Sequence, residues 1–265
     1  MSPQVDDLIQ AVLSSSKYRS IDPALIARIG ERELAKGRKF KEAVKATKNK
    51  LHQVGGAYHT EPPRYSEWLN SLEEASGSLP ELKLACREVM GAHASTRERL
   101  PILDHFYTTI FEQLPQINSV LDVACGLNPL AIPWMPLQSR TKYFACDIYA
   151  DMIAFIQNFL DLLPVHGAAN LCDVAAAPPS QPIDLALVLK AIPCLEQIDR
   201  QAGDRLLDGL QAKYILISFP AKSLGGRNKG MLENYEARFT QLTEGRGWQF
   251  QRFTFETELA FLAET

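Results

Sequence analysis

Three acidic residues follow short apolar runs, and their order along the chain suggests how a ligand is held. Asp122 opens the segment DVACGLNP, Asp147 lies 21 residues after Gly126, and Asp173 follows a third run. Gly126 permits a tight turn and a close approach of the backbone to a ligand. A carboxylate placed like Asp147 can accept hydrogen bonds from both hydroxyls of a ribose, and one placed like Asp173 can accept from the amino group of adenine.

Taken singly, each of these acids could equally be a helix cap or a turn residue. Three of them at three successive strand ends favour an adenosine ligand. The first segment is not the GxGxxG fingerprint, and it has no glycine pair to cradle a pyrophosphate, which disfavours a dinucleotide. An adenosine ligand without a diphosphate is S-adenosylmethionine.

The elements that would position these residues alternate between strand and helix from about residue 118 onward. Apolar runs predict strands over residues 119–124, 142–147, 168–173, 183–189, 214–219, 248–255 and 259–263. Helices are predicted between the earlier strands, over residues 151–163 and 197–210. This alternation implies a parallel sheet with helices on both faces, and the last two strands should form an antiparallel edge hairpin. The predicted class is α/β, with a Rossmann-like sheet that binds ligands at the carboxyl ends of its strands.

The first part of the chain has a different pattern. Residues 1–105 predict an all-helical domain, and residues 106–265 predict the ligand-binding domain. Asp22-Pro23 opens one helix, and a basic helix follows over residues 40–54, stopped by Gly55-Gly56. Ser95 or Thr96 is predicted to cap a later helix.

A basic segment lies inside the helical part. Residues 17–50 contain eleven Lys or Arg and four Asp or Glu, a charge of +7 in a chain whose net charge is −3. Clustered cations release counterions from phosphates, so the segment suggests a polyanionic partner such as a nucleic acid. The other interpretation is a solvated helical face. A membrane is a weaker candidate partner, because the segment lacks a strong aromatic or leucine face.

The composition excludes several other classes of protein. Apolar residues make up 46% and charged residues 22%, as in ordinary globular proteins rather than disordered or fibrous ones. No apolar run approaches the roughly 18–20 residues that cross a bilayer, and the first ten residues lack the pattern of a secretory signal. The five cysteines form no CxxC pair, so reduced thiols, a cytoplasmic location and no metal site are expected.

Three segments resemble signature blocks of one enzyme family. They are HASTRERL at residues 93–100, VLDVACGLNPLA at residues 120–131 and SFPAKSLGGRNKGM at residues 218–231. The blocks look like those of the aminoglycoside-resistance 16S ribosomal RNA methyltransferases, which methylate N7 of guanine 1405. Residues 189–196, LKAIPCLE, are similar to a fourth block. The resemblance runs from about residue 17 to the C-terminus and is weakest over residues 61–89 and 133–166.

The resemblance implies a class I methyltransferase fold with S-adenosyl-L-methionine as the cofactor. Arg99 would pair with the methionine carboxylate, Asp147 would bind the ribose, and Asp173 with Val174 would bind the adenine. The implied cofactor set is Tyr58, His93, Ala94, Ser95, Arg99, Ala124, Gly126, Asp147, Ile148, Asp173, Val174 and Leu189. Lys190 would lie with Leu189 between the cofactor and the target base, as a positioning residue.

The resemblance also implies that the helical domain docks on 16S RNA within the assembled 30S subunit. Arg227 and Lys229 lie in a glycine-rich loop suited to closing on phosphates, and Arg97 could also touch RNA. The expected RNA contacts are Lys17, Arg19, Arg32, Lys36, Lys39, Lys41, Lys45, Lys50, Arg227 and Lys229.

The implied acceptor sets the chemistry. Guanine N7 has an in-plane lone pair and no proton, so no general base is needed and none is nominated. Catalysis would consist of positioning, with the nucleophile held about 3 Å from the methyl carbon. The base would be turned out of its RNA helix to reach the pocket. Phe219 is either a platform on which that base stacks or an aromatic of the core.

Two other functions stay open at this stage. One is a related 16S ribosomal RNA methyltransferase that acts on a different base, such as N1 of an adenine. That reaction must lose a proton, and its enzymes usually present aromatic residues that clamp the base. The other is a non-catalytic RNA-binding protein with the same fold. Binding of S-adenosylmethionine separates the second from the enzymes, and mapping of the modified nucleotide separates the enzymes from each other.

Overall fold

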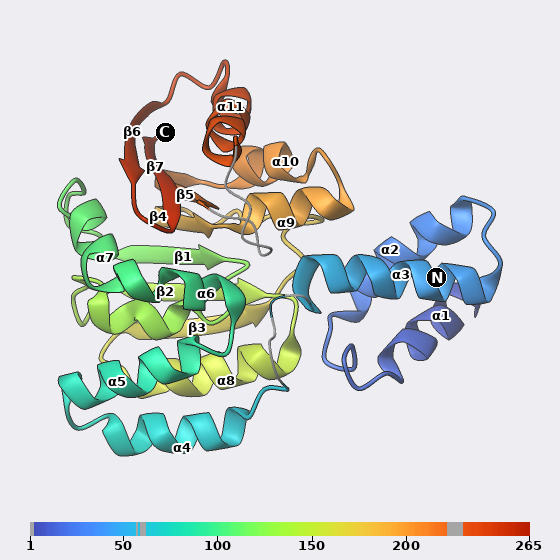
Figure 1. Cartoon of the computed structure of the whole chain (residues 1–265), viewed down its shortest axis with the longest axis horizontal. Coiled ribbons are helices and arrows are strands. Elements are labelled where there is room, and N and C mark those ends of the chain that lie inside the picture. Colours follow the sequence, from blue (N-terminus) through green and yellow to red (C-terminus); the bar gives the residue numbers. More distant parts are fainter. Residues whose placement is uncertain (1–2, 57, 59–61, 222–229) are drawn as a thin grey trace.

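A lobe of three helices begins the chain and stands apart from the rest (Figure 1). The computed structural model describes residues 3–56, 58, 62–221 and 230–265. The lobe consists of α1 (Pro3–Leu13), α2 (Pro23–Ala35) and α3 (Phe40–Leu51), continued by the π-helical turn η1 (His52–Gly56). The Asp22 side chain accepts a hydrogen bond from the N–H of Ala24 at 2.9 Å, and Pro23 lies in the first turn. This is the helix start that the Asp-Pro pair predicts.

Four further helices precede the sheet. They are α4 (Tyr65–Ala75), α5 (Leu79–Met90), α6 (Ala94–Arg99) and α7 (Leu103–Phe111), with the 3₁₀ turn η2 (Leu100–Ile102) between the last two. His93 precedes the first residue of α6, so the predicted cap at Ser95 or Thr96 is wrong. Thr96 lies inside the first turn, where its hydroxyl donates back to the carbonyls of Met90 at 2.6 Å and His93 at 3.1 Å.

Seven strands form one sheet, as predicted. They are β1 (Ser119–Val123), β2 (Lys142–Asp147), β3 (His166–Leu171), β4 (Ile183–Leu189), β5 (Ala212–Pro220), β6 (Gln249–Thr254) and β7 (Glu258–Glu264). Their order is β3-β2-β1-β4-β5-β7-β6. Strands β1 to β5 are parallel, and β7 pairs antiparallel with both β5 and β6. The expected antiparallel hairpin is therefore present, with β6 at the edge.

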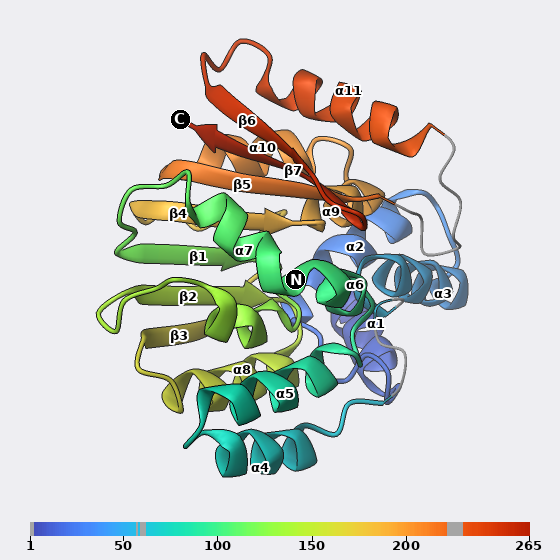
Figure 2. The ribbon, with the colours of Figure 1, turned by 60° about the vertical axis from the view of Figure 1, so that its left-hand side comes forward.

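Helices cover both faces of this sheet (Figure 2). The remaining elements are η3 (Asn128–Trp134), α8 (Ala150–Asp161), α9 (Ala191–Ile198), α10 (Ala202–Gly209) and α11 (Met231–Thr243). Successive strand residues alternate between two apolar cores: Val120 packs with α7 and α8 on one face, and Leu121 packs with α9, α10 and α11 on the other. Two buried faces require the continuous apolar strands that the sequence shows.

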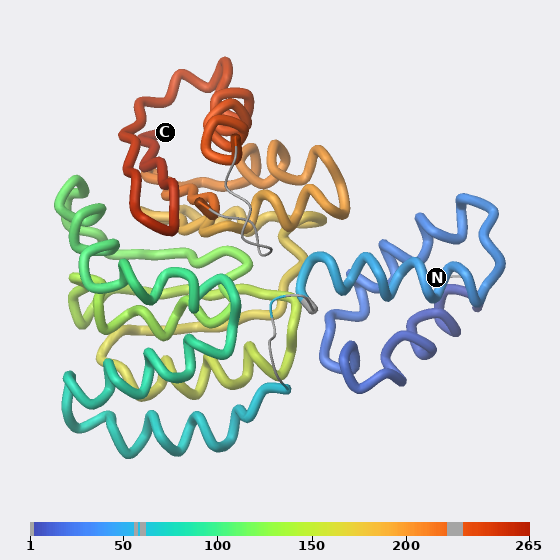
Figure 3. The backbone as a smooth tube through the Cα atoms, in the orientation of Figure 1, coloured from blue at the N-terminus to red at the C-terminus, as the bar shows by residue number. Residues whose placement is uncertain are grey.

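Two predicted boundaries differ from the structure. Helices α4 to α7 pack against α8, η3 and the sheet, so the separate lobe ends near η1 rather than at residue 105 (Figure 3). The single helix predicted over residues 197–210 is two helices, because Asp199 interrupts it. The Asp199 side chain accepts from the N–H of Gln201 at 3.1 Å, as a capping residue does.

Within the described residues, no helix is long and apolar enough to cross a membrane. The same residues contain no group of three or more His, Cys, Asp or Glu that could hold a metal ion.

Candidate cofactor site

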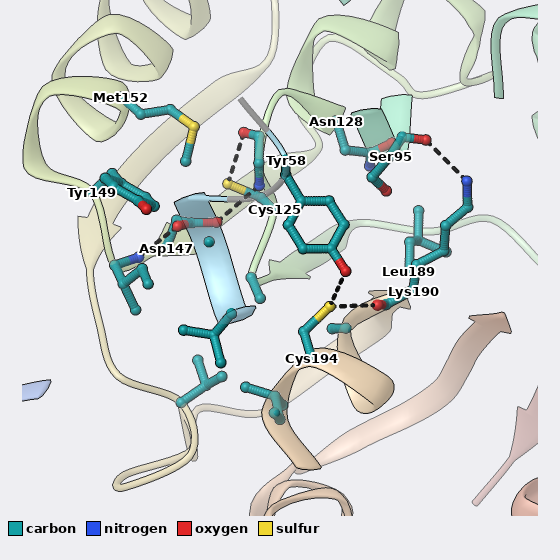
Figure 4. Close-up of a pocket in the computed structure, with 18 of the residues that line it drawn as sticks. Tyr58, Ser95, Cys125, Asn128, Asp147, Tyr149, Met152, Leu189, Lys190 and Cys194 are labelled. Atoms are coloured by element: carbon teal, nitrogen blue, oxygen red, sulfur yellow. Dashed lines mark hydrogen bonds between the residues drawn. The ribbon is translucent and has the colours of Figure 1, made fainter. Parts of the chain in front are cut away.

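A cavity of about 880 Å³, a volume that includes solvent at its mouth, lies at the carboxyl ends of the parallel strands (Figure 4). This is where an open parallel sheet binds ligands. Eleven of the twelve predicted cofactor residues line it: Tyr58, His93, Ser95, Arg99, Ala124, Gly126, Asp147, Ile148, Asp173, Val174 and Leu189. Ala94 does not line the cavity; it is buried, and its N–H donates to the carbonyl of Tyr58 at 2.9 Å.

The turn after β1 brings the backbone against the cavity. Ala124 and Gly126 both have left-handed backbone conformations, with φ of 49° and 52°. A Cβ on Gly126 would lie 2.8 Å from Cε1 of His93, so only glycine fits without a shift. The N–H of Gly126 donates to Oδ2 of Asp147 at 2.9 Å, and the N–H of Ile148 donates to Oδ1 at 2.6 Å. Asp147 therefore fixes this turn as well as facing the cavity.

Asp147 is 8% exposed. Burial raises the pKa of its carboxyl group, although the backbone N–H groups that it accepts from act in the opposite direction. A carboxylate has about four lone-pair positions, and the backbone N–H groups of Gly126, Ile148 and Tyr149 act on this one, so a position remains for a ligand hydroxyl.

Asp147→Ala is expected to weaken the binding of S-adenosylhomocysteine about tenfold or more, because each charge-assisted hydrogen bond lost is worth about 1.5–3 kcal/mol. Calorimetry on the purified protein measures this. Asp161→Ala, at the exposed far end of α8, is the matched control and should bind like the parent. Unchanged affinity in Asp147→Ala would remove this residue from the site.

The adenosine end of the cavity is built from two parts of the chain. Asp173 and Val174 follow β3, and Leu25, Val54 and Gly55 reach the cavity from the N-terminal lobe. The sequence patterns did not indicate these lobe residues as ligand contacts. Their position becomes clear only once the lobe lies against the strand ends.

The other end of the cavity contains a buried polar network. The Arg99 side chain is 1% exposed; its Nε and Nη2 donate to Glu258 at 3.0 and 2.7 Å, and its Nη1 donates to Oδ1 of Asn128 at 2.7 Å. Glu258 also accepts from the hydroxyl of Ser218 at 2.5 Å. Burial alone would raise the pKa of Glu258, but the charges of Arg99 and Lys190 hold it below its usual value. The expected methionine-binding arginine is thus present at the cavity, already held by an internal carboxylate.

Lys190 lies at the end of β4 in a left-handed conformation, with φ of 57°. Such backbone is strained for a residue other than glycine and persists where its surroundings hold it. Its Nζ donates to the carbonyl of Ser95 at 2.9 Å and to Glu98 at 3.1 Å, and lies 3.4 Å from Glu258. Lys190 lines the cavity and is 5% exposed, so it is not a surface lysine.

Asp122 joins the same network from β1. It accepts from Nδ2 of Asn128 at 2.9 Å and from the hydroxyl of Tyr143 at 2.7 Å. Burial raises the pKa of Asp122 to about 7, although both hydrogen bonds act in the opposite direction. Asp122 lines the cavity, and its Oδ1 is buried and has no hydrogen-bond partner among the described residues.

The raised pKa of Asp122 predicts a pH dependence of stability. From the ordinary value of 3.8 up to about 7, the folded protein keeps a proton on Asp122 that the unfolded chain has lost. The free energy of unfolding therefore decreases as the pH rises through this window. Asp122→Asn keeps an acceptor for Asn128 and Tyr143 but removes this titration, so its urea-unfolding free energy should fall less from pH 5 to pH 8 than the parent's. Parallel pH profiles would contradict the assignment.

Several residues of the site carried no clear signal in the sequence. A hydrogen bond of 2.9 Å joins the Sγ atom of Cys194 and the hydroxyl of Tyr58, and it links α9 to the segment around Tyr58 (Figure 4). Tyr149 and Met152 line the cavity on the same side as Asp147. Glu258 was predicted in a turn. A carboxylate directly before an apolar strand was the available signal for it.

Phe219 is not a stacking platform. It is fully buried and stacks on Tyr235 at a centroid distance of 5.0 Å, so no base can reach its ring. It belongs to the core between the sheet and α11.

The basic residues divide into paired and unpaired groups. Lys17 contacts His52, Arg32 pairs with Asp199, Lys36 pairs with Glu33, and Lys50 donates to the carbonyl of Gln197. The candidates that are exposed and have neither an ion pair nor a side-chain hydrogen bond within the described part of the chain are Arg19, Lys39, Lys41 and Lys45. Arg227 and Lys229 lie outside the described residues.

Comparison with known proteins agrees with this architecture. Residues 14–262 match the family described as ribosomal RNA methyltransferase (FmrO). The chain is 38% identical over 265 residues to a 16S rRNA (guanine(1405)-N(7))-methyltransferase of Micromonospora echinospora, covering 98% of this chain and 97% of the relative. It is 40% identical to the enzyme of the same name from Frankia casuarinae, covering 97% and 93% of the two chains.

Solved structures give the same result. The 16S rRNA methyltransferase RmtF, in complex with S-adenosyl-L-homocysteine, is 29% identical with a TM-score of 0.82, covering 100% of this chain and 99% of that one. The 16S rRNA methylase RmtB is 30% identical with a TM-score of 0.76, covering 98% of each chain. The chain belongs to the FmrO family of ribosomal RNA methyltransferases.

Proposed function

We propose that this protein methylates N7 of guanine 1405 in 16S ribosomal RNA of the 30S subunit, with S-adenosyl-L-methionine as the methyl donor, and thereby confers aminoglycoside resistance. The observation that carries the proposal is the full-length identity of 38–40% to enzymes of that name. The cavity at the strand ends supports it from the structure.

The residues around the cavity fit the cofactor. Asp147 offers an acceptor for a ribose hydroxyl, and Asp173 with Val174 provides the adenine wall. At the other end, Oδ1 of Asp122 has no partner among the described residues, and once the carboxyl group is ionised it offers an acceptor that suits the ammonium of the methionine part. Arg99 has further N–H groups beyond those given to Glu258 and Asn128, and these suit the methionine carboxylate. When bound, the cofactor supplies a methyl group on a sulfonium.

The chain's own residues contribute positioning. Guanine N7 carries no proton, so no residue has to act as a base. Leu189 and Lys190 lie at the end of β4, and the contacts of Lys190 with Ser95, Glu98 and Glu258 fix its side chain. A rigid wall of this kind excludes water and holds an extruded base in line with the methyl group.

The 30S subunit is the proposed partner because the lobe carries a cluster of exposed cations that form no ion pair among the described residues. Lys39, Lys41 and Lys45 lie together at the start of α3 and within it, and they are exposed. Such a cluster suits a surface of RNA phosphates. A ribosomal substrate supports a cytoplasmic location.

Transfer of a labelled methyl group tests the substrate. Purified full-length protein is incubated with labelled S-adenosylmethionine and either 30S subunits or free 16S RNA. We expect incorporation into the 30S subunits and little into the free RNA, because the lobe docks on the folded subunit. Equal labelling of both would contradict the subunit as the substrate, and no labelling of either would contradict the proposed function.

A further inference from the structure

Helix α2 of the N-terminal lobe reaches the adenosine end of the cavity. Leu25 lines the cavity, and Arg28, one turn later, contacts Asp173 beyond the end of β3. The Nε of Arg28 donates to Oδ2 of Asp173 at 2.8 Å, and its Nη2 lies 2.7 Å from the same oxygen. One helix of the lobe thus supplies both an apolar wall of the site and the partner of a cofactor-binding carboxylate.

This ion pair is shielded from solvent. The side chains of Arg28 and Asp173 are 19% and 9% exposed, whereas those of Arg32 and Asp199, one turn along the same helix, are 46% and 17% exposed. A shielded pair is less screened by salt and holds its geometry more firmly than an exposed one.

Arg28 leaves Asp173 able to bind a ligand. The other oxygen of Asp173, Oδ1, accepts from the N–H of Ala175 at 3.2 Å. A carboxylate has about four lone-pair positions, so these contacts orient it and still leave acceptors for the amino group of adenine. Among the described lobe residues, Arg28 is the one whose side chain is hydrogen-bonded to Asp173.

The lobe has other attachments at this edge. The N–H of Asp22 donates to the carbonyl of Ile148 at 2.9 Å, and the N–H of Ala150 donates to that of Ser20 at 2.7 Å. Ile148 itself lines the cavity. The lobe and the cofactor therefore share a wall, and a ligand in the cavity contacts both.

We propose that Arg28 is a positioning residue that holds Asp173 for the adenine, and that through this contact cofactor binding and RNA docking by the N-terminal lobe strengthen each other. The second half rests on the proposed function. A ligand that packs on Leu25 and bonds to the Asp173–Arg28 pair favours the lobe orientation seen in the structure. A 30S subunit that needs the same lobe orientation then binds the cofactor-loaded protein more tightly than the free protein. By linkage, the bound 30S subunit raises the affinity for the cofactor by the same factor.

The first test measures cofactor affinity without ribosomes. S-adenosylhomocysteine and adenosine are titrated into the full-length parent, Arg28→Ala, Arg28→Lys and Arg32→Ala. We expect Arg28→Ala to weaken the binding of both ligands by about tenfold. This equals the loss of one charge-assisted hydrogen bond, here the bond from the adenine to an Asp173 carboxylate that Arg28 no longer orients. Arg28→Lys, which retains the cation, should recover part of the affinity. Arg32→Ala, whose partner Asp199 does not line the cavity, should leave it unchanged.

Two outcomes would overturn the positioning role. One is unchanged affinity in Arg28→Ala. The other is an equal loss in Arg28→Ala and Arg32→Ala, which would mean that any loosening of the lobe weakens the site. Thermal unfolding of each variant checks that the fold persists, and the partial rescue by Arg28→Lys separates a contact from a general loss of stability.

The second test measures the coupling. Binding of 30S subunits to the parent is compared with and without saturating S-adenosylhomocysteine, and we expect about a fivefold tightening or more, within the usual range of coupling. In Arg28→Ala the ratio should approach one. A ratio of one in the parent would overturn the coupling. Methyl transfer to 30S subunits at saturating S-adenosylmethionine is measured alongside, so that a failure of the coupling is distinguished from a failure of the proposed function.

Discussion

Arg99→Ala is expected to lower the free energy of unfolding by about 3–5 kcal/mol and to weaken S-adenosylhomocysteine binding about tenfold or more. Arg99 donates to both oxygens of Glu258 in the interior. Its removal leaves that carboxylate buried, with Lys190 at 3.4 Å as the nearest remaining cation. Urea unfolding measures the first effect, and calorimetry measures the second.

Arg97→Ala is the matched control, because Arg97 is exposed on the same helix and forms no ion pair in the part of the chain that the structure describes. Damage in Arg97→Ala with a normal Arg99→Ala would show that the assignment of this helix to the site is wrong. The double variant Arg99→Met, Glu258→Gln should regain stability relative to Arg99→Ala, since both members of the ion pair are then neutral and Lys190 keeps Glu98 at 3.1 Å. It should not regain cofactor affinity.

The strands and the acids at their carboxyl ends could be predicted because their signals are local, whereas most of the other cavity residues came from the resemblance to the methyltransferase family. Asp122, Asp147 and Asp173 each lie at or directly after an apolar strand, and parallel strands bring their carboxyl ends to one edge. The antiparallel hairpin followed from the absence of a helix between the last two strands. Gly126 could also be predicted as a site residue, because a glycine directly after a strand permits a tight turn.

Contacts between distant parts of the chain could not be predicted in this way. Arg99 and Glu258 are 159 residues apart, and Arg28 and Asp173 are 145 apart. The hydrophobic periodicity of the sequence does not indicate which buried carboxylate pairs with which arginine. Phe219 shows the same limit: its place after an apolar strand suited either a platform or the core, and the packing of Tyr235 from α11 decided for the core.

Replacing Lys39, Lys41 and Lys45 together by Glu is expected to weaken binding to 30S subunits on the order of a hundredfold or more, because three cations facing phosphates become anions. The log–log salt dependence should flatten by about one unit for each lost phosphate contact. Aminoglycoside resistance of a host expressing the variant should decrease in parallel. Binding titrations across a range of salt concentrations give both quantities.

Cofactor affinity of this triple variant should equal the parent's, since none of the three lysines lines the cavity. Charge reversal at Arg140 and Lys142 is the control for net charge. Both are exposed at the amino-terminal edge of the sheet, opposite the cavity, and the control should bind 30S subunits like the parent. If the triple variant keeps the parent's affinity and salt slope, the basic segment is only a solvated face.

The most direct test of the proposed function is to map the nucleotide that the protein modifies. The 16S RNA is extracted from 30S subunits after reaction with S-adenosylmethionine, and strand scission specific for 7-methylguanine is compared with primer-extension stops that mark N1-methyladenine. We expect scission at guanine 1405, and it should be absent when the cofactor is omitted. Modification at another base, or bound cofactor with no modified nucleotide, would contradict the proposed function.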